Sequence, residues 1–473
     1  MSSSDAPRPW LHFAGAAGSG MSALVQFHAG SGGFATGSDR AFDHGERADE
    51  RAAFERLGVV ITPQDGSFLA AAPGPCSGLV VSTAVEDDVP DVAAARAAGV
   101  PILHRSELLA RYVEQHRTVA VSGTSGKSTV TAMVFSILRA AGLGPGLLTG
   151  AALADLAADG HLGNAWAPAP RPGDEPLLVI EADESDGSLV RYRPWCGVVL
   201  NLGLDHKPPA EIMAMFRTFR ARTRGPFVVG DDPALDELAD GALRFGLAEG
   251  RPGLPGCFAA DVVLGPASVR FTLDGTPFTV PHPGRHTVLN ACAAAAACRT
   301  VGVADAVAAR ALAGFGGVAR RFCSLGTARG VEVIDDFAHN PDKIAAALAA
   351  ARGRAPKGRV LAVFQPHGFG PTRFLKDALI AAFAEALAPG DVAWLPEIFY
   401  AGGTVSRDIS SADLAAGVTA RGRDARFVAV RADIPAAIAA EAKAGDLVLV
   451  MGARDPSLTA FGRTILAALG QER

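Results

Sequence analysis

The sequence has few cysteines, no long uninterrupted hydrophobic run and no excess of positive charge, and each absence excludes a class of protein. The six cysteines form no Cys-x-x-Cys pair and no metal-finger spacing, so we expect small core residues in a reducing compartment. The most apolar stretch, Ala291 to Gly314, is interrupted by charged residues, which favours alanine-rich helices over a membrane span. The N-terminus has no basic segment followed by an apolar one, which predicts a cytoplasmic protein without a signal peptide.

The charge balance argues against non-specific partners. The net charge is −5, and the Lys and Arg residues are spread along the chain. We therefore expect no binding to nucleic acid or to membranes, and any anionic ligand must be held by a local site. Since 473 residues exceed what one ordinary core can organise, more than one domain is expected.

Three times along the chain an apolar run of strand type leads into a glycine-rich turn and then a helical pattern. The runs at Leu11–Ala14, Thr118–Val121 and Val360–Phe364 belong to the three blocks. This alternation is typical of α/β domains with parallel sheets. We expect a Rossmann-like N-terminal domain, a P-loop-type central ATPase domain with a mostly parallel sheet, and a Rossmann-like C-terminal domain, at residues 1–112, 113–315 and 316–473.

The second block contains a phosphate-binding loop. The strand ending at Ser122 is followed by Gly-Thr-Ser-Gly-Lys-Ser-Thr and then by an apolar helix. Glycines let several backbone N–H groups face a phosphate, and the helix N-terminus adds a partial positive charge. Lys127 is placed to reach the outer phosphates and Ser128 to bind Mg²⁺. The sequence therefore predicts ATP or GTP binding by Gly123, Thr124, Ser125, Gly126, Lys127, Ser128 and Thr129.

Acidic and histidine residues follow two further apolar strands of the same block. Glu181 opens the segment Glu-Ala-Asp-Glu-Ser-Asp, and the second strand leads through Asn201 to Asp205 and His206. Polar side chains at the carboxyl ends of strands that share a sheet with a phosphate loop are where metal ligands are expected. We predict Ser128 and Glu181 as metal-binding residues.

The first block has a glycine loop of its own. Gly15, Gly18, Ser19 and Gly20 follow a strand, and Ser38-Asp39 comes about twenty residues later. This dinucleotide-type pattern places an acidic residue where it can bind a ribose or another hydroxyl group. Taken alone, the pattern suggests NAD.

Together these motifs resemble the Mur ligases of peptidoglycan synthesis. The resemblance covers nearly the whole chain in order. It continues in Pro283–Asn290, Gly317–Phe322, Asp335–Pro341, Phe364–His367 and Gly445–Ala453. Within the family it is greatest to the members that add L-alanine to UDP-N-acetylmuramate.

The resemblance implies an ATP-dependent ligase that activates a carboxylate as an acyl phosphate and transfers it to an amino acid. It implies ATP and Mg²⁺ as cofactors, a UDP-sugar carboxylate and an amino acid as substrates, and a monomer or weak dimer. Domain closure would exclude water from the acyl phosphate. The residues implied as catalytic are Lys127, His206, Arg321, His339 and His367. The resemblance also implies that His206 helps to bind a second metal or positions the acyl phosphate.

The family also implies the binding residues. Asn290 contacts the adenine, Asp336 the ribose, and Arg321 the γ-phosphate. The first glycine loop holds the diphosphate of a UDP-sugar rather than NAD. The substrate-binding residues expected on this basis are Gly15, Gly18, Ser19, Gly20, Ser38, Asp39, Ser82 and Arg373.

The chain departs from the L-alanine-adding pattern in several places. Ser125 stands where His is usual, and of the arginine-rich segment that follows Gln365-Pro366-His367 only Arg373 is present. Such arginines bind substrate carboxylates, so the acceptor stays open. The alternatives are a paralogue that joins a different amino acid or a peptide, a non-catalytic nucleotide-binding regulator, and an NAD-dependent oxidoreductase with an appended ATPase, for which the sequence offers no hydride-transfer site.

Overall fold

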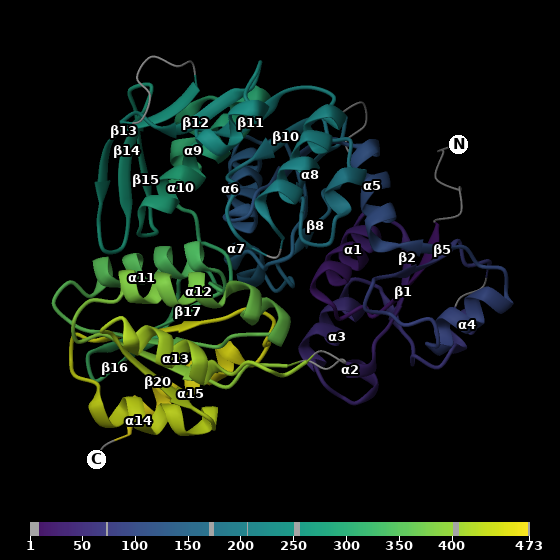
Figure 1. Cartoon of the computed structure of the whole chain (residues 1–473). Helices are drawn as coiled ribbons and strands as arrows, with labels where there is room; N and C mark the ends of the chain where they lie inside the picture. Colours follow the sequence, from purple (N-terminus) through teal and green to yellow (C-terminus); the bar gives the residue numbers. More distant parts are fainter. Residues whose placement is uncertain are drawn as a thin grey trace. The chain divides into compact units, whose positions relative to one another are not determined.

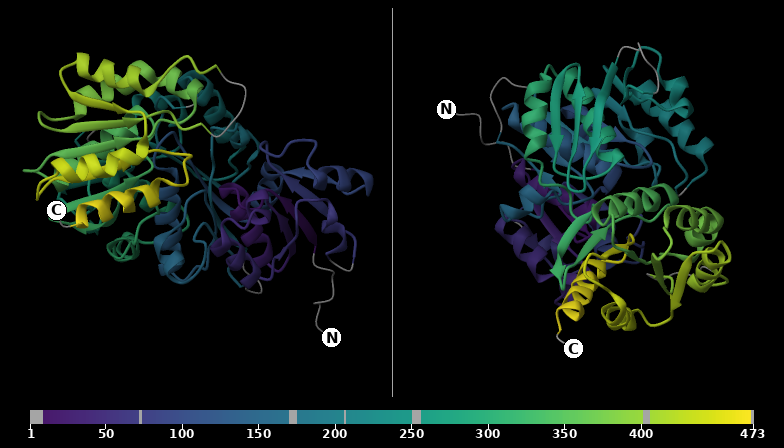
Figure 2. Two further views of the ribbon diagram at one scale, coloured as in Figure 1. Left: turned by 90° about the horizontal axis from the view of Figure 1, so that it is seen from below. Right: turned by 90° about the vertical axis from the view of Figure 1, so that its left-hand side faces the viewer.

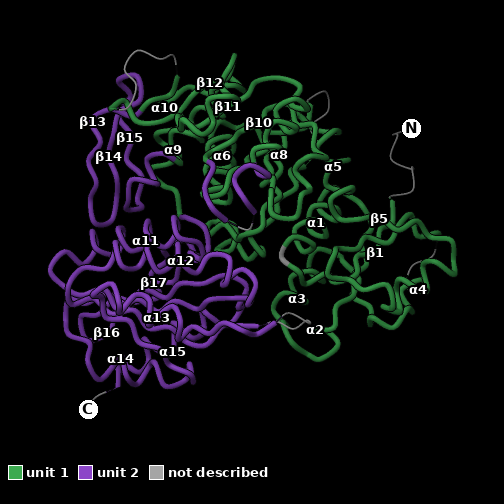
Figure 3. The backbone as a smooth tube through the Cα atoms, viewed as in Figure 1, with its two compact units in different colours: residues 1–201, 213–258, 290–316 green, residues 202–212, 259–289, 317–473 purple. Residues whose placement is uncertain are grey.

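A computed structural model describes residues 9–71, 74–169, 175–205, 207–249, 256–400 and 406–471. The chain falls into two compact units, one of residues 1–201, 213–258 and 290–316 and the other of residues 202–212, 259–289 and 317–473 (Figure 3). The domain bounds expected from the sequence remain predictions. Within the described ranges, no helix combines the length and the apolar character that a membrane crossing needs.

The N-terminal part of the first unit, purple to blue in Figure 1, is a parallel sheet with the strand order β3-β2-β1-β4-β5. The order reverses between β1 and β4, which opens a crevice at the carboxyl ends of these two strands. Its elements are β1 (Trp10–Ala14), α1 (Ser19–Gly30), β2 (Phe34–Ser38), α2 (Arg40–Asp43), α3 (Ala48–Arg56), β3 (Val60–Ile61), η1 (Ser67–Ala70), β4 (Gly78–Val81), α4 (Pro90–Ala97), β5 (Ile102–His104) and α5 (Arg105–Gln115).

The remainder of the first unit is built on strands in the order β12-β11-β10-β6-β9-β7-β8, parallel apart from β8. Strand β6 lies between β10 and β9, so the loop that follows it meets the ends of both neighbours. The elements from β6 to β12 are β6 (Arg117–Ser122), α6 (Lys127–Ala140), β7 (Gly146–Leu148), α7 (Ala154–Ala158), β8 (Ala165–Trp166), β9 (Leu177–Glu181), η2 (Ser188–Arg191), β10 (Cys196–Val199), α8 (Pro209–Arg222), β11 (Phe227–Gly230), η3 (Pro233–Leu238) and β12 (Leu243–Leu247).

Three antiparallel strands follow that the sequence did not lead us to expect. Strands β13 (Gly256–Leu264), β14 (Val269–Leu273) and β15 (Thr276–Val280) pair in that order, and the two units divide within β13. Buried and exposed residues alternate along β14 and β15, which is the pattern of a sheet with one solvated face. The alanine-rich stretch forms two helices, as predicted: α9 (Arg285–Thr300) and α10 (Asp305–Ala313).

The C-terminal part of the second unit is a sheet of order β16-β17-β21-β18-β19-β20, antiparallel only at β16. Helices α11, α12 and α13 cover one face of this sheet over one buried cluster, and α14 and α15 cover the other face over a second. Figure 2 shows the yellow and green helices on both sides of the sheet. The predicted three-domain α/β fold is thus confirmed. The elements are β16 (Cys323–Ala328), β17 (Val331–Asp336), α11 (Pro341–Arg354), β18 (Val360–Phe364), α12 (Phe369–Ala386), β19 (Val392–Pro396), α13 (Ser411–Ala420), β20 (Asp424–Val428), η4 (Arg431–Asp433), α14 (Ile434–Glu441), β21 (Leu447–Met451) and α15 (Leu458–Gly470).

Candidate active site

The loop between β6 and α6 can only be built with glycine at two positions. Gly123 has a φ of +136°, and a Cβ there would lie 2.9 Å from Cβ of Leu200. Gly126 has a φ of +88° and caps α6, and a Cβ there would lie 2.6 Å from Oδ1 of Asn290. These conformations are open to glycine at little cost. The loop therefore has the curled backbone of a phosphate cradle, with the predicted adenine contact Asn290 against it.

Asn201, at the end of the neighbouring strand β10, holds this loop in place. Its Oδ1 accepts hydrogen bonds from Thr124 Oγ1 and Ser125 N, both at 2.9 Å, and its Nδ2 donates to the Ser125 carbonyl at 3.0 Å. The sequence contained Asn201 in a motif but gave it no role. The structure makes it the side chain that fixes the middle of the phosphate loop.

Lys127 lies among carboxylates at the start of α6. Its Nζ donates to Glu184 Oε2 at 2.8 Å and to the Gly123 carbonyl at 2.9 Å, and it lies 3.5 Å from Asp183. Burial alone lowers the pKa of Lys127, but the charges of Glu184 and Asp183 outweigh it and raise the pKa above its ordinary value. The ammonium therefore stays charged and ready to meet an anionic group.

Two of the three predicted metal ligands come together beside this lysine. Ser128 Oγ donates to Glu181 Oε1 at 3.0 Å, and Glu181 Oε2 accepts from Thr149 Oγ1 at 2.7 Å and from Gly150 N at 3.0 Å. Thr149, which is 4% exposed, follows β7 and was not singled out in the sequence. The loop after β7 thereby fixes the direction in which the Glu181 carboxylate points.

The donor set fits magnesium. Hydroxyl and carboxylate oxygens are the ligands that Mg²⁺ prefers, and Mg²⁺ commonly takes one or two protein ligands plus substrate phosphates and water. Among the described residues there is no group of three or more His, Cys, Asp or Glu side chains placed to hold a metal ion. The third predicted ligand, His206, lies outside the described residues.

In the second unit, Asp336 shapes the turn that carries Arg321. Its Oδ2 accepts from Phe322 N and its Oδ1 from Ala338 N, both at 2.7 Å. Arg320 and Phe322 have φ values of 56° and 54°, the left-handed region that costs energy for residues other than glycine. Burial raises the pKa of Asp336. The predicted ribose contact therefore also supports the backbone at Phe322, directly after the predicted γ-phosphate contact Arg321.

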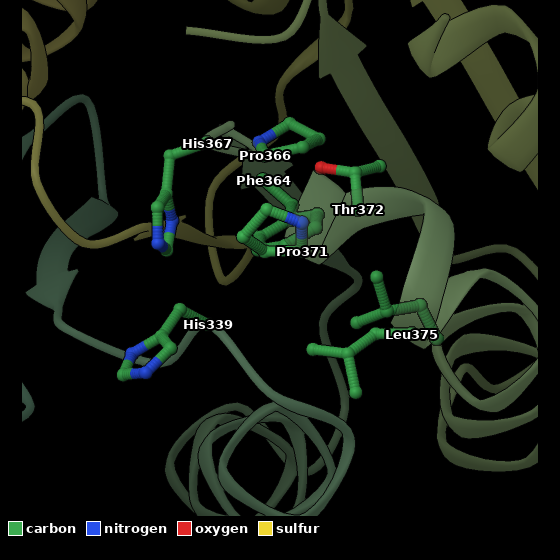
Figure 4. A pocket seen from close by; sticks show the side chains of 8 residues that line it. His339, Phe364, Pro366, His367, Pro371, Thr372 and Leu375 are labelled. Carbon is green, nitrogen blue, oxygen red and sulfur yellow. The ribbon is translucent and has the colours of Figure 1, made fainter. Parts of the chain in front are cut away.

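The two histidines predicted near the amino acid lie together. The rings of His339 and His367 are 5.6 Å apart, and Figure 4 shows both at one side of a small pocket whose other side is formed by Pro371 and Leu375. The cavity measures about 10 Å³, close to the least that can hold one water molecule. Burial lowers the pKa of His339 to about 4, which keeps its imidazole neutral at neutral pH.

Charged residues surround this histidine pair. Asp205 lies 2.8 Å from the ammonium of Lys343 and 3.6 Å from His339 Nε2. Arg373, the retained arginine, pairs with Asp408 and donates to the Ser406 carbonyl at 3.2 Å. The structure thus shows Arg373 in an ion pair of its own on an exposed surface.

The glycine loop after β1 gathers the predicted substrate-binding residues of the first unit. Gly15 N and Ala16 N both donate to the Ser38 carbonyl, at 2.8 and 3.0 Å. Asp39 accepts from Ala17 N and from Ala41 N, both at 2.9 Å, so it holds the loop and caps α2. Gly18 is the N-cap of α1, Gly20 lies in its first turn, and Ser82 directly follows the adjacent strand β4. Ser19 begins α1, and its side chain lies outside the described set.

A buried polar network supports this loop from below and was not foreseen in the sequence. Ser38 Oγ donates to Asp91 Oδ2 at 2.5 Å, and the same oxygen lies 3.3 Å from His12 Nε2. His12 Nδ1 lies 2.8 Å from Thr36 Oγ1. All four residues are fully buried. Ser38, a predicted substrate contact, therefore also belongs to the interior of this domain.

Comparison with known proteins places the chain among named enzymes. The model described as "Mur ligase family, catalytic domain" matches residues 11–117, and "Mur ligase, glutamate ligase domain" matches residues 320–454. The UDP-N-acetylmuramate–L-alanine ligase of Paenarthrobacter aurescens is 37% identical over 97% of each chain. The enzyme of the same name from Xanthomonas campestris pv. campestris is 36% identical over 94% of this chain and 93% of its own.

Solved structures show the same fold. The UDP-N-acetylmuramate–alanine ligase of Thermotoga maritima has a TM-score of 0.75 at 24% identity and covers 97% of this chain and 98% of its own. A murein peptide ligase of Psychrobacter arcticus has a TM-score of 0.67 at 22% identity, with 98% and 99% covered. The likeness extends over all three sheets.

Proposed function

The chain belongs to the Mur ligase family, and we propose that it joins L-alanine to UDP-N-acetylmuramate at the expense of ATP. The observation that carries the proposal is the cluster at the end of β6, β7 and β9, where Lys127, Ser128 and Glu181 meet beside a phosphate cradle. The relatives that are 36 to 37% identical over nearly the full chain bear the name of this reaction.

The proposed reaction has two steps. An oxygen of the donor carboxylate attacks the γ-phosphorus of ATP, ADP leaves, and an acyl phosphate forms. The amino group of the acceptor then attacks the acyl carbon, inorganic phosphate leaves, and the amine loses a proton. Phosphoryl transfer of this kind depends on positioning and charge stabilisation more than on covalent chemistry by the protein.

The side chains divide this work. We propose that Lys127 and Arg321 stabilise the charge of the transferred phosphoryl group and that Ser128 and Glu181 hold one Mg²⁺. His206 would help to hold a second metal ion or position the acyl phosphate. The metal would neutralise charge on the phosphate oxygens. Gly15 to Gly20 would hold the diphosphate of the donor. Neutral His339, with His367, would orient the acceptor amine.

The pocket beside His339 and His367 supports an acceptor with an apolar side chain. Its wall of Pro371 and Leu375 suits a methyl group better than a charged group. One observation favours the alternative acceptor: Arg373 is paired with Asp408, so no arginine of this segment is placed to bind a carboxylate. A different amino acid or a peptide therefore stays as the second candidate.

Five of the six cysteines are buried, as expected of small core residues, and we infer the reducing cytoplasm from the cysteine spacing in the sequence. Oligomeric state was predicted as monomer or weak dimer and remains a prediction.

The test is a screen of acceptors. Purified protein with ATP, Mg²⁺ and UDP-N-acetylmuramate should release phosphate with L-alanine, and mass spectrometry should find the amide product. Release with another amino acid or a peptide, but none with L-alanine, would favour the second candidate. ATP binding without release for any acceptor would indicate a non-catalytic regulator.

A further inference from the structure

Arg105 is an arginine outside every motif that lies against the first glycine loop. It is the first residue of α5, whose start is fixed by a capping box between His104 and Glu107. A Cβ at Gly20, in the first turn of α1, would lie 2.7 Å from Nη1 of Arg105. The guanidinium therefore packs directly on the part of the loop where the proposed diphosphate would be held.

The same guanidinium also reaches the acidic segment of the ATP site. Its Nη2 donates to Asp186 Oδ2, and Asp186 Oδ1 accepts from Ser188 N at 2.9 Å. The side chains of Arg105 and Asp186 are 25% and 20% exposed, so the pair is partly shielded from water. Asp186 is two residues from Glu184, which binds Lys127 at 2.8 Å. Arg105, Asp186 and Glu184 thus connect the glycine loop after β1 to Lys127 in the loop after β6.

Neighbouring ion pairs do not share this position. Arg191 lies 3.4 Å from Glu107, with the two side chains 52% and 43% exposed, and Arg193 lies 4.0 Å from Glu114. Both join α5 to the segment after Asp186, but neither lies at Gly20. Exposed pairs of this kind contribute little to stability, so they provide matched controls for Arg105.

We propose that Arg105 binds the diphosphate of the nucleotide-sugar donor and, through Asp186, couples donor binding to ATP binding. The inference rests on the proposed function, because it takes the donor to occupy the first glycine loop. A guanidinium has five N–H donors in a rigid fork. One nitrogen can hold Asp186 while another faces a phosphate oxygen, and a charge-assisted bond of this kind is stronger than a neutral one.

Coupling follows because both ligands act on one segment. A diphosphate that fixes the guanidinium also fixes Asp186, and with it the direction of Glu184 beside Lys127. The donor then binds to a protein in which the ATP-site carboxylates are already ordered. By linkage, ATP must raise the affinity for the donor by the same factor.

The test is calorimetric titration of the whole protein with UDP-N-acetylmuramate, with and without a non-hydrolysable ATP analogue. In the wild type the analogue should tighten donor binding about fivefold or more. Arg105→Ala should weaken donor binding about tenfold and remove the coupling. Asp186→Asn should keep most of the donor affinity but lose the coupling, and Arg191→Gln should leave both unchanged.

Three results would decide against the inference. Arg105→Ala could match Arg191→Gln in donor affinity, Asp186→Asn could retain the coupling, or the analogue could leave the wild-type donor affinity unchanged. If Arg105→Ala does not fold, Arg105→Lys keeps the charge but not the fork and should still weaken donor binding. Failure of the wild type to bind UDP-N-acetylmuramate would contradict the proposed function itself, so the two failures are distinguishable.

Discussion

The two glycine loops of the first unit have the same local design and different charges. Each follows a buried parallel strand, leads into a helix and lies where neighbouring strands end. The loop after β6 contains its own lysine, which faces Glu184 and Asp183. The loop after β1 contains no basic residue, and two arginines from outside it lie against it: Arg47 donates to the Ala17 carbonyl, and Arg105 from α5 lies at Gly20. In the proposed function, the loop after β6 stabilises the phosphoryl group that is transferred, and the loop after β1 holds a diphosphate that does not react.

The largest difference between the two loops is expected from the variant Lys127→Ala. If the loop after β6 carries the chemistry, turnover should fall on the order of 10³-fold, the cost of removing a group that stabilises charge in the transition state. Donor binding at the other loop should change little. Phosphate release and calorimetric titration of UDP-N-acetylmuramate measure the two effects, and a loss of turnover below tenfold would contradict the division of work.

The loop after β6 also depends on a backbone conformation that only glycine adopts without strain. Gly123→Ala places a Cβ 2.9 Å from Leu200 Cβ and 3.1 Å from its backbone nitrogen, at a φ of +136°. Because backbone cannot move aside, we expect a loss of about 3 kcal/mol in the free energy of unfolding. Urea denaturation measures this loss. A variant as stable as the wild type would show that the loop can relax.

The sequence predicted the loops because both consist of an apolar strand, glycines and a helix start. Strands β1, β6 and β18 were recognised because each is a buried apolar run. The motifs along the whole chain identified the ATP-dependent Mur-type ligase. Strands β13 to β15 were missed because their residues alternate between buried and exposed and contain no long apolar run. A short strand with one exposed face is harder to recognise in a sequence than a continuous apolar run.

The residues that hold the site's motifs in place could not be predicted from sequence patterns. Thr149, Asn201 and Arg105 act on motifs 32, 76 and 81 residues away in the chain, and no spacing rule connects them. Asp336 was assigned to the ribose by resemblance, whereas its bonds to Phe322 N and Ala338 N appear only in the fold. Motifs identify the side chains that meet a ligand, and tertiary contacts decide which residues hold them.

A smaller effect is expected at the other loop from Gly20→Ala. The atom nearest to the new Cβ is the far end of Arg105, 2.7 Å away, and a flexible side chain can move. Alanine also favours the helix more than glycine does, so the free energy of unfolding should change by less than about 1 kcal/mol. Donor affinity should nevertheless fall several-fold, because the guanidinium is displaced. Unchanged donor affinity in a folded variant would separate Arg105 from the donor site.

The smallest effect is the pH dependence of stability that comes from the buried network of His12 and Asp91 under the loop after β1. Burial lowers the pKa of His12, an effect only partly offset by Asp91. The bonds from His12, Ser38 and Gly66 outweigh burial and lower the pKa of Asp91. We infer a neutral histidine beside a charged carboxylate. Between the lowered pKa of His12 and about 6.5, the unfolded chain binds a proton that the folded chain does not, so stability is lost as the pH falls through this window.

His12→Gln tests this sign because glutamine keeps hydrogen-bonding capacity without titrating. The variant should be less stable than the wild type at pH 7.5, since the contacts to Thr36 and Asp91 are altered. The difference in the free energy of unfolding should shrink toward pH 5.5, because only the wild type loses the stability that comes from the lowered pKa of His12. Urea midpoints of both proteins at three pH values measure the gap. A gap that widens at low pH would mean that His12 is protonated in the fold, and the first loop would then rest on a buried ion pair much as the second one does.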